Sequence, residues 1–225
     1  MIWLFDYDLT LYGADEHCVL DSLDRRISLS VQNATGVDSE TAHKIRKDYL
    51  ARFGTTLAGL QALHGVQPDD FFDFIHQPQY LTYPKHSPQK RELLMGLGGH
   101  RYVFTNGRRD WSEAGMNHMG IRDCIEDVFY LKQMDWVGKP HEIAYEKLEL
   151  WLAEKLPNQF TPEGLPTDPS RIVLLEDSVR NLEPAYRRGW KTVLVNPLAD
   201  VPDWVDFHIP DLMCLESVLP ELSVL

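Results

Sequence analysis

The chain has 225 residues, of which 44% are hydrophobic, and its 22 basic and 34 acidic residues give a net charge of −12. This length suffices for one domain, or for one domain that carries a smaller insert. The acidic balance opposes binding to polymeric nucleic acid or to an anionic membrane, so a small anionic substrate would need a local cation.

The sequence contains no sign of export or of membrane insertion. No apolar run approaches the roughly 18 residues of a membrane span, and the N-terminus reaches Asp6 too early for a signal peptide. Cys18, Cys124 and Cys214 are widely spaced without a CxxC pair, which indicates neither a disulfide framework nor a zinc site. We expect a cytoplasmic protein that is a monomer or a homodimer.

The first ten residues, MIWLFDYDLT, combine a short apolar run with two acidic side chains. A continuous apolar run such as Ile2 to Phe5 is typical of a strand in a parallel sheet that is covered on both faces. Asp6 and Asp8 would then lie at the carboxyl end of that strand.

Residues 13–87 contain the start and stop signals of several short helices, which predict a small helical bundle. Apolar residues at helical spacing predict a first helix from Asp15 into the low thirties. Ser39 is the expected cap of a second helix that ends at Gly54. Thr55 and Thr56 open a third helix that stops at Gly65, and Pro68 begins a fourth.

From about residue 90, short β-branched or aromatic runs alternate with helical segments. The runs are YVFTNG, DVFYL, RIVLLEDS and KTVLVN, and helices are expected near 109–118, 140–154 and 179–188. This alternation predicts an α/β fold, a Rossmann-like parallel sheet wrapped by helices. We expect residues 1–12 and 88–225 to form this core and residues 13–87 to form the inserted helical bundle. The proline-rich stretch 155–170 would be a surface loop.

Polar residues end several of the expected strands, and ligands of open parallel sheets bind outside these strand ends. Clustered carboxylates repel one another unless a hard cation lies among them, and oxygen ligands favour Mg²⁺. Lys139 would balance the remaining charge, while the Thr105 hydroxyl and the amides of Asn106 and Gly107 can bind phosphate oxygens. The acidic candidates are Asp6, Asp8, Glu176 and Asp177.

Asp6 and Asp8 can have different roles in phosphoryl transfer. One carboxylate can attack phosphorus while the other donates a proton to the leaving oxygen. We expect Asp6 to be ionised and Asp8 to be protonated in the first step, because the two roles need different environments.

Together, DYDLTLY, FTNG, KP and EDSVRNL resemble the four signature motifs of the haloacid dehalogenase superfamily of phosphatases, in order and over nearly the whole chain. The resemblance implies that Asp6 is the nucleophile and Asp8 the acid and base, and that Thr105 and Lys139 hold the phosphoryl group. It also implies that Mg²⁺ is bound by Asp6, the Asp8 backbone carbonyl and Asp177. The helical insert then corresponds to the cap of that superfamily.

Within the superfamily, DLTLY, FGTTLAGLQALHGV, FTNG and EDSVRNLEPA are similar to pyrimidine 5′-nucleotidase-like members. The chain departs from that pattern at three positions. Leu9 replaces a usual Asn and removes a side-chain hydrogen bond, and Trp111 stands where His is frequent and offers a stacking face. Glu176 replaces a usual Asp, and would bind the metal directly, bind it through water, or position a ligand.

The resemblance predicts an Mg²⁺-dependent phosphomonoester hydrolase that acts through an aspartyl-phosphate, with a pyrimidine nucleoside 5′-monophosphate as the substrate. Phosphatases of small sugar phosphates or of phosphoglycolate share all four motifs and are an alternative. A non-catalytic phosphate-ligand-binding protein of the same fold is another.

The weaker candidates have structural alternatives. Tyr12 could pack or face a nucleobase, and Thr55 and Thr56 could cap a helix or contact substrate. Thr105 could cap the following helix, and Lys139 could be an ordinary surface lysine.

Overall fold

A six-stranded sheet forms the core of one compact unit of the structure. The computed structural model describes residues 1–197 and 200–222. Every neighbouring pair of strands is parallel, in the order β3-β2-β1-β4-β5-β6. This arrangement confirms the predicted α/β fold class. The strands are β1 (Ile2–Phe5), β2 (His100–Thr105), β3 (Asp127–Tyr130), β4 (Ile172–Glu176), β5 (Lys191–Val195) and β6 (Phe207–Ile209).

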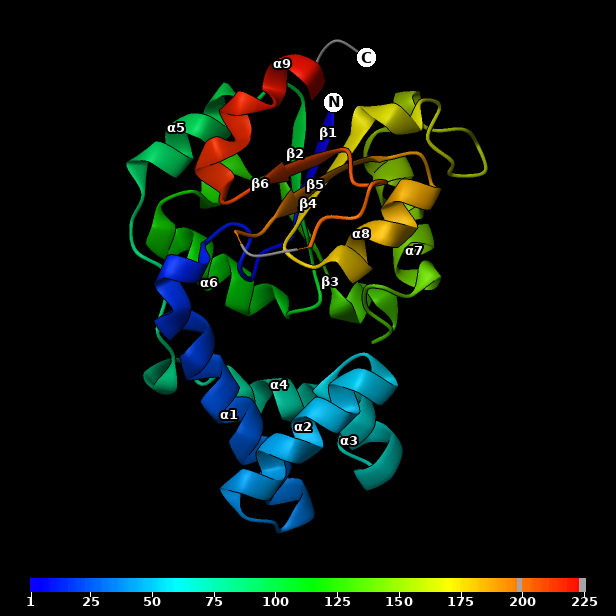
Figure 1. Ribbon diagram of the computed structural model, residues 1–225. Coiled ribbons are helices and arrows are strands. Elements are labelled where there is room, and N and C mark those ends of the chain that lie inside the picture. The colour runs from blue at the N-terminus through cyan, green and yellow to red at the C-terminus, as the bar shows by residue number, and fades with distance from the viewer. Residues whose placement is uncertain (198–199, 223–225) are drawn as a thin grey trace. The chain divides into compact units, whose positions relative to one another are not determined.

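Helices cover both sides of this sheet (Figure 1). The helices α7 and α8 lie on one side, and α5 and α6 lie on the other. All four residues of β1 are buried, as expected for an apolar central strand that is covered on both faces. The helices are α5 (Pro88–Gly96), α6 (Arg109–Met119), α7 (Glu142–Lys155), α8 (Val179–Arg187) and α9 (Leu219–Leu222).

Three of the strands and α-helices that the structure describes were not predicted from the sequence, and one of them, the helix α9, has only four residues. The strand β6 has only three residues, too few for a recognisable alternation of apolar and polar side chains. The helix α5 begins at a proline after a serine cap, and only Leu93 and Leu94 of its nine residues are buried. So narrow an apolar face gives a weak periodic signal.

The strand order places a topological switch point beside β1. The chain proceeds from β1 to β2 and β3 on one side, and then crosses to β4 on the other side of β1. In the paired register, Phe5 lies opposite Val103 of β2 and Leu175 of β4. The residues that follow these three strands therefore meet at one edge, where open α/β sheets bind ligands.

A second compact unit, residues 15–83, is inserted after β1, while residues 1–14 and 84–222 belong to the first unit. The second unit, residues 15–83, contains four α-helices, and α1 packs against α2, α3 and α4. Among the residues that the structure describes, no helix of either unit is long and apolar enough to span a membrane. The four helices are α1 (His17–Thr35), α2 (Ser39–Phe53), α3 (Thr56–His64) and α4 (Pro68–Ile75).

The helix ends in this unit follow the sequence signals with one correction. Asp38, rather than Ser39, caps α2, because its side chain accepts a hydrogen bond from the Thr41 amide. Gly54 and Gly65 end α2 and α3 in the left-handed conformation, with φ of 83° and 67°. A residue with a β-carbon would be strained at both positions.

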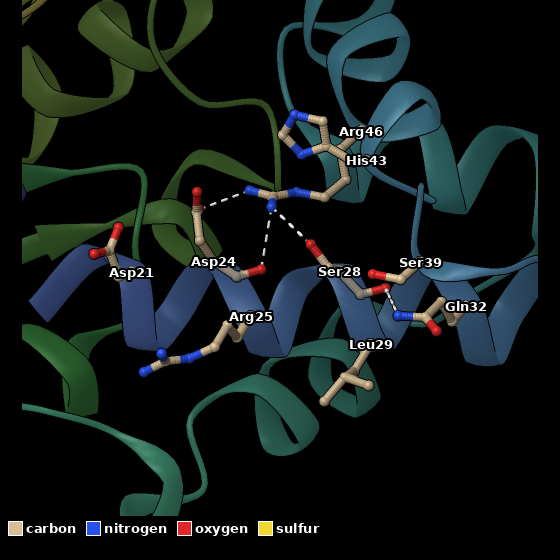
Figure 2. Close-up of a pocket in the computed structure, with 9 residues that line it drawn as sticks. All are labelled: Asp21, Asp24, Arg25, Ser28, Leu29, Gln32, Ser39, His43 and Arg46. Carbon is tan, nitrogen blue, oxygen red and sulfur yellow. Dashed lines mark hydrogen bonds and ion pairs between the residues drawn. The ribbon is translucent and has the colours of Figure 1, made fainter. Parts of the chain in front are cut away.

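Arg46 joins α2 to α1 inside the helical unit. Its Nη2 donates to Asp24 Oδ1 at 2.6 Å, and its Nη1 donates to the Asp24 carbonyl at 3.1 Å and to Ser28 Oγ at 2.8 Å (Figure 2). These residues line a groove of about 530 Å³. The Arg46 side chain is only 15% exposed, so its hydrogen bonds are partly shielded from water.

We expect Arg46→Met to lower the free energy of unfolding by about 1–3 kcal/mol, because three hydrogen bonds to a charged group are lost. Arg52→Met on the same helix is the matched control. The pair that Arg52 forms with Asp48 is more than half exposed on the arginine side, so its loss should cost less than about 1 kcal/mol. Urea unfolding of both variants measures the difference, and equal losses would contradict the assigned role of Arg46.

Candidate active site

Lys139 lies at the centre of the site and is only 2% exposed. Its Nζ donates to Asp6 Oδ1 at 2.8 Å, to Glu176 Oε2 at 2.6 Å and to the Phe104 carbonyl at 2.7 Å. Burial by itself lowers the pKa of Lys139, but the carboxylates of Asp6 and Glu176 raise it above its ordinary value. Lys139 is therefore a buried, charged ammonium that joins residues of β1, β2 and β4 or their carboxyl ends, and the surface-lysine alternative is wrong.

Three carboxylates lie together at this site, and Lys139 donates to two of them, Asp6 and Glu176. One oxygen each of Asp6, Glu176 and Asp177 lies within 4.8 Å of the others. Burial raises the pKa of Asp6 to about 8, and the charge of Glu176 adds to this effect against the opposing charge of Lys139. Burial and Glu176 likewise raise the pKa of Asp177 to about 9.

With a pKa of about 8, Asp6 would be mostly protonated at neutral pH in the absence of a cation, whereas the sequence predicts it to be ionised. Three carboxylates and one ammonium would carry a net charge of −2, and the protein groups alone do not neutralise it. A divalent cation bound by carboxylate oxygens supplies the missing charge and lowers the pKa of its ligands. The donor set therefore fits a hard cation such as Mg²⁺.

Both oxygens of Glu176 already have protein partners. Oε2 accepts from Lys139, while Oε1 accepts from Asn181 Nδ2 at 3.0 Å and from the Ser178 amide at 3.3 Å. Glu176 is 1% exposed. This arrangement favours a role in orienting Lys139 over direct metal ligation.

The Asn106 side chain holds the backbone of Lys139 in place. Its Nδ2 donates to the Lys139 carbonyl at 2.8 Å, and its Oδ1 accepts from the Lys139 amide at 2.7 Å. A β-carbon on Gly138 would lie 2.3 Å from Asn106 Oδ1, so only glycine allows this approach. The structure thus adds a positioning role for the Asn106 side chain to the phosphate contact predicted for its amide.

Thr105 and Gly107 form a tight turn after β2. Thr105 Oγ1 accepts a hydrogen bond from the Gly107 amide at 2.9 Å. Arg108, rather than Thr105, is the N-cap residue of α6, so the helix-cap alternative for Thr105 is wrong. A β-carbon on Gly107 would lie 3.8 Å from Asp8 Oδ2, which shows that this turn adjoins the second aspartate.

Two aromatic side chains bind the other oxygen of Asp8. Tyr12 Oη donates to Asp8 Oδ1 at 2.7 Å, and Trp111 Nε1 donates to the same oxygen at 2.9 Å. Trp111 is 1% exposed, so the predicted stacking face is wrong, because the indole is buried and its N–H contacts Asp8. Burial and the neighbouring Asp8 raise the pKa of Tyr12 far above its usual range, so this phenol stays protonated. Tyr12 is also fully buried, which favours packing over contact with a nucleobase.

Leu9 has a left-handed backbone conformation, with φ of 59°. Asn adopts this conformation more readily than a branched apolar residue does. The turn between Asp8 and Tyr12 therefore has a left-handed residue at position 9 although leucine adopts this conformation less readily than asparagine does.

Thr55 and Thr56 belong to the helical unit. Thr55 is the N-cap of α3, and its hydroxyl accepts from the Ala58 amide at 3.0 Å, while Thr56 is the first residue of that helix. This is the local capping role considered from the sequence. Contact of either residue with substrate stays a prediction.

Sequence reasoning missed Asn196, which follows β5. Its Nδ2 donates to the Asp177 carbonyl at 3.2 Å. The available signal was its place at the end of the run KTVLVN, because the other site residues also follow strands.

No protein-family model matches this chain. Among solved structures, it is similar to a HAD (haloacid dehalogenase) phosphatase from Thermococcus onnurineus, with a TM-score of 0.62 and 18% identity over 97% of each chain. It is also similar to the Bacillus subtilis protein YfnB, named as a HAD-hydrolase and bound to magnesium, with a TM-score of 0.59 and 18% identity over 97% of this chain and 98% of that one. An L-2-haloacid dehalogenase from Xanthobacter autotrophicus with covalently bound chloropropionic acid has a TM-score of 0.56 and 16% identity over 97% of this chain and 98% of that one.

These similarities establish the fold. The neighbouring proteins are HAD-superfamily members that include a phosphatase and dehalogenases, which are hydrolases of two kinds. A shared fold does not fix the reaction, so the reaction must be argued from the side chains of the site.

We expect the thermal midpoint of the protein in EDTA to fall as the pH rises from about 4 to about 8. The folded pKa of Asp6, about 8, exceeds its ordinary value of 3.8, so the unfolded chain releases this proton at lower pH. The resulting stabilisation is complete below about pH 4 and is lost as the pH rises through the folded pKa. Added Mg²⁺ should raise the midpoint, and more so towards pH 8, as calorimetry with and without the ion would show.

Asp177→Asn provides the control, because it removes one of the three carboxylates. This variant should lose most of the Mg²⁺ effect and part of the pH dependence. A midpoint in the wild type that responds to neither pH nor Mg²⁺ would contradict the assignment of a cation site.

Proposed function

We propose that this chain is an Mg²⁺-dependent phosphomonoester hydrolase of the haloacid dehalogenase superfamily that acts through an aspartyl-phosphate intermediate. The supporting observation is that carboxylate oxygens of Asp6, Glu176 and Asp177 lie within 4.8 Å of one another, with Lys139 bonded to the first two and Asp8 beside the Thr105–Gly107 turn. This arrangement provides a nucleophile, a cation site and an acid at one edge of the sheet.

The first step forms a bond between an Asp6 oxygen and phosphorus. Lys139 holds Oδ1, so we assign the attack to Oδ2. The bond between phosphorus and the leaving oxygen breaks, and Asp8 donates a proton to that oxygen to release the alcohol. The Thr105 hydroxyl and the Asn106 and Gly107 amides would hold the phosphoryl oxygens. Lys139 would act on them through its positive charge, because its three N–H groups already donate to protein oxygens.

The second step hydrolyses the aspartyl-phosphate. Asp8, now a carboxylate, accepts a proton from water as the water oxygen attacks phosphorus. The bond between phosphorus and Asp6 breaks, which returns the Asp6 carboxylate and releases inorganic phosphate. Each residue thus ends the cycle in its starting protonation state.

Mg²⁺ would be held by Asp6, Asp177 and the Asp8 backbone carbonyl, with Glu176 close by. The bound ion would supply positive charge that keeps Asp6 ionised and offsets charge on the phosphoryl oxygens. The charge balance of the cluster supports this assignment.

A pyrimidine nucleoside 5′-monophosphate is the substrate class that we propose. The similarity of DLTLY, FGTTLAGLQALHGV and EDSVRNLEPA to pyrimidine 5′-nucleotidase-like proteins supports this choice. Small sugar phosphates and phosphoglycolate remain the alternative substrates. We propose a cytoplasmic location and no macromolecular substrate, on the basis of the acidic net charge of −12 and the widely spaced cysteines.

The chemistry of the site favours phosphate transfer over dehalogenation. A halide leaves without a proton, whereas the hydrogen bonds of Tyr12 and Trp111 hold Asp8 beside the turn that would bind phosphate.

A substrate panel tests the proposal directly. We expect Mg²⁺-dependent release of phosphate from UMP, CMP and dUMP, with less from sugar phosphates and phosphoglycolate, and none in EDTA. Chloropropionate should release no halide. Phosphate release without nucleotide preference would refute the substrate class, and failure to turn over any phosphomonoester would indicate a non-catalytic binder.

Asp6→Asn should lower kcat by about ten-thousand-fold or more, because the amide cannot form the aspartyl-phosphate. Asp38→Asn is the matched control, since asparagine caps a helix about as well as aspartate does, and its kcat should stay unchanged. Substantial turnover by Asp6→Asn, measured with the preferred nucleotide, would contradict the nucleophile assignment.

A further inference from the structure

Two side-chain donors reach the same oxygen of Asp8. Both Tyr12 Oη and Trp111 Nε1 donate to Oδ1, at 2.7 and 2.9 Å. Oδ2 lies on the side of Gly107, where an added β-carbon would be 3.8 Å from this oxygen and 3.2 Å from Thr105 Oγ1. One oxygen of Asp8 is therefore held by two donors, and the other adjoins the turn proposed to bind the phosphoryl group.

The two donors are themselves held by packing. Tyr12 and Trp111 are both buried, and each makes an edge contact with the ring of Tyr7, at centroid distances of 5.4 and 6.0 Å. A β-carbon on Gly115 would lie 1.5 Å from Tyr7 Oη, so glycine at this position in α6 makes room for the Tyr7 side chain. The three rings consequently fix the directions of the two hydrogen bonds.

A protonated carboxyl group has one oxygen that accepts and one that carries the proton. An oxygen that already receives an O–H and an N–H is poorly suited to carry a proton, because its lone pairs are occupied. The proton of Asp8 is thereby directed to Oδ2, the oxygen beside the Thr105 and Gly107 turn.

We propose that Trp111 and Tyr12 are positioning residues that orient Asp8 so that Oδ2, and not Oδ1, exchanges the proton with the leaving alcohol. This inference rests on the proposed function and extends it to residues without assigned chemistry. In the first step, the Oδ2–H bond breaks and an O–H bond forms on the alcohol as its bond to phosphorus breaks. In the second step, Oδ2 takes a proton from the attacking water, while Oδ1 keeps both hydrogen bonds throughout.

If Tyr12 and Trp111 position Asp8, the rate loss on removing either donor should depend on the leaving group of the substrate. A poor leaving group, such as the alkoxide of an alkyl phosphate, needs protonation by Asp8, whereas 4-nitrophenolate leaves with little assistance. A residue that merely stabilised the fold would affect both substrates alike.

The test uses Trp111→Phe and Tyr12→Phe, each of which removes one donor and keeps an aromatic ring. Rapid quench measures release of the alcohol in the first turnover, with Mg²⁺ present, for 4-nitrophenyl phosphate and for glycerol phosphate. We expect each variant to slow release about tenfold to hundredfold with glycerol phosphate and less than about threefold with 4-nitrophenyl phosphate.

Two matched controls lose a similar hydrogen bond elsewhere in the same unit. Trp3→Phe removes the bond from Trp3 Nε1 to the Gly98 carbonyl near the amino end of β1, and Tyr102→Phe removes the bond from Tyr102 Oη to Glu126. Neither control should change the ratio of the two rates. In an Asp8→Asn background, Trp111→Phe should cause almost no further loss with glycerol phosphate, because the positioned acid is already absent.

The outcomes separate the two proposals. Equal losses with both substrates, no loss with either, or full additivity with Asp8→Asn would overturn the positioning role while leaving the phosphatase function intact. A wild-type protein that releases alcohol from neither phosphate and inorganic phosphate from none of UMP, CMP and dUMP would overturn the proposed function, and the positioning role with it.

Discussion

The buried ammonium of Lys139 is the interaction on which the site depends. It bonds to Asp6, to Glu176 and to the Phe104 carbonyl, and so ties together the ends of three neighbouring strands. Removing one partner from a buried charge network typically costs about 3–5 kcal/mol, because the remaining charges lose their compensation. Three neighbouring carboxylates and one ammonium also leave an excess of negative charge, so the cluster fits the cation that we propose as well as serving as a structural junction.

Neutral side chains position the charged ones. Asn106 holds the backbone of Lys139 from both sides, Asn181 holds Glu176, and Trp111 with Tyr12 holds Asp8. Each of these donors or acceptors is fixed by its packing and hydrogen bonds, so the reacting groups need little reorganisation when a substrate binds. The glycines at 138 and 115 belong to the same arrangement, since a β-carbon at either position would collide with one of these supports or with the ring that packs against them.

The fold alone does not select the reaction. Proteins of similar fold include both a phosphatase and a haloacid dehalogenase, and both are below 20% identical to this chain. The features that bear on the reaction are local: a carboxylate cluster that fits a divalent cation, and a second aspartate held in one orientation next to the turn that we propose binds phosphate. These features suit a reaction whose leaving oxygen must be protonated.

The sequence by itself determined the parallel sheet, the inserted helices and the candidate residues Asp6 and Asp177, because apolar runs that end in polar residues specify both the strands and the side chains at their carboxyl ends. Lys139 follows no such run and became a candidate only as part of the set of four motifs. It did not determine that Trp111 donates to Asp8 across 103 positions of the chain, that Asn196 supports Asp177, or that burial raises the pKa of Asp6. Such facts depend on which strand ends become neighbours and how much water they exclude. Local sequence pattern encodes the period of an element, whereas hydrogen-bond partners and desolvation arise only when distant segments pack together.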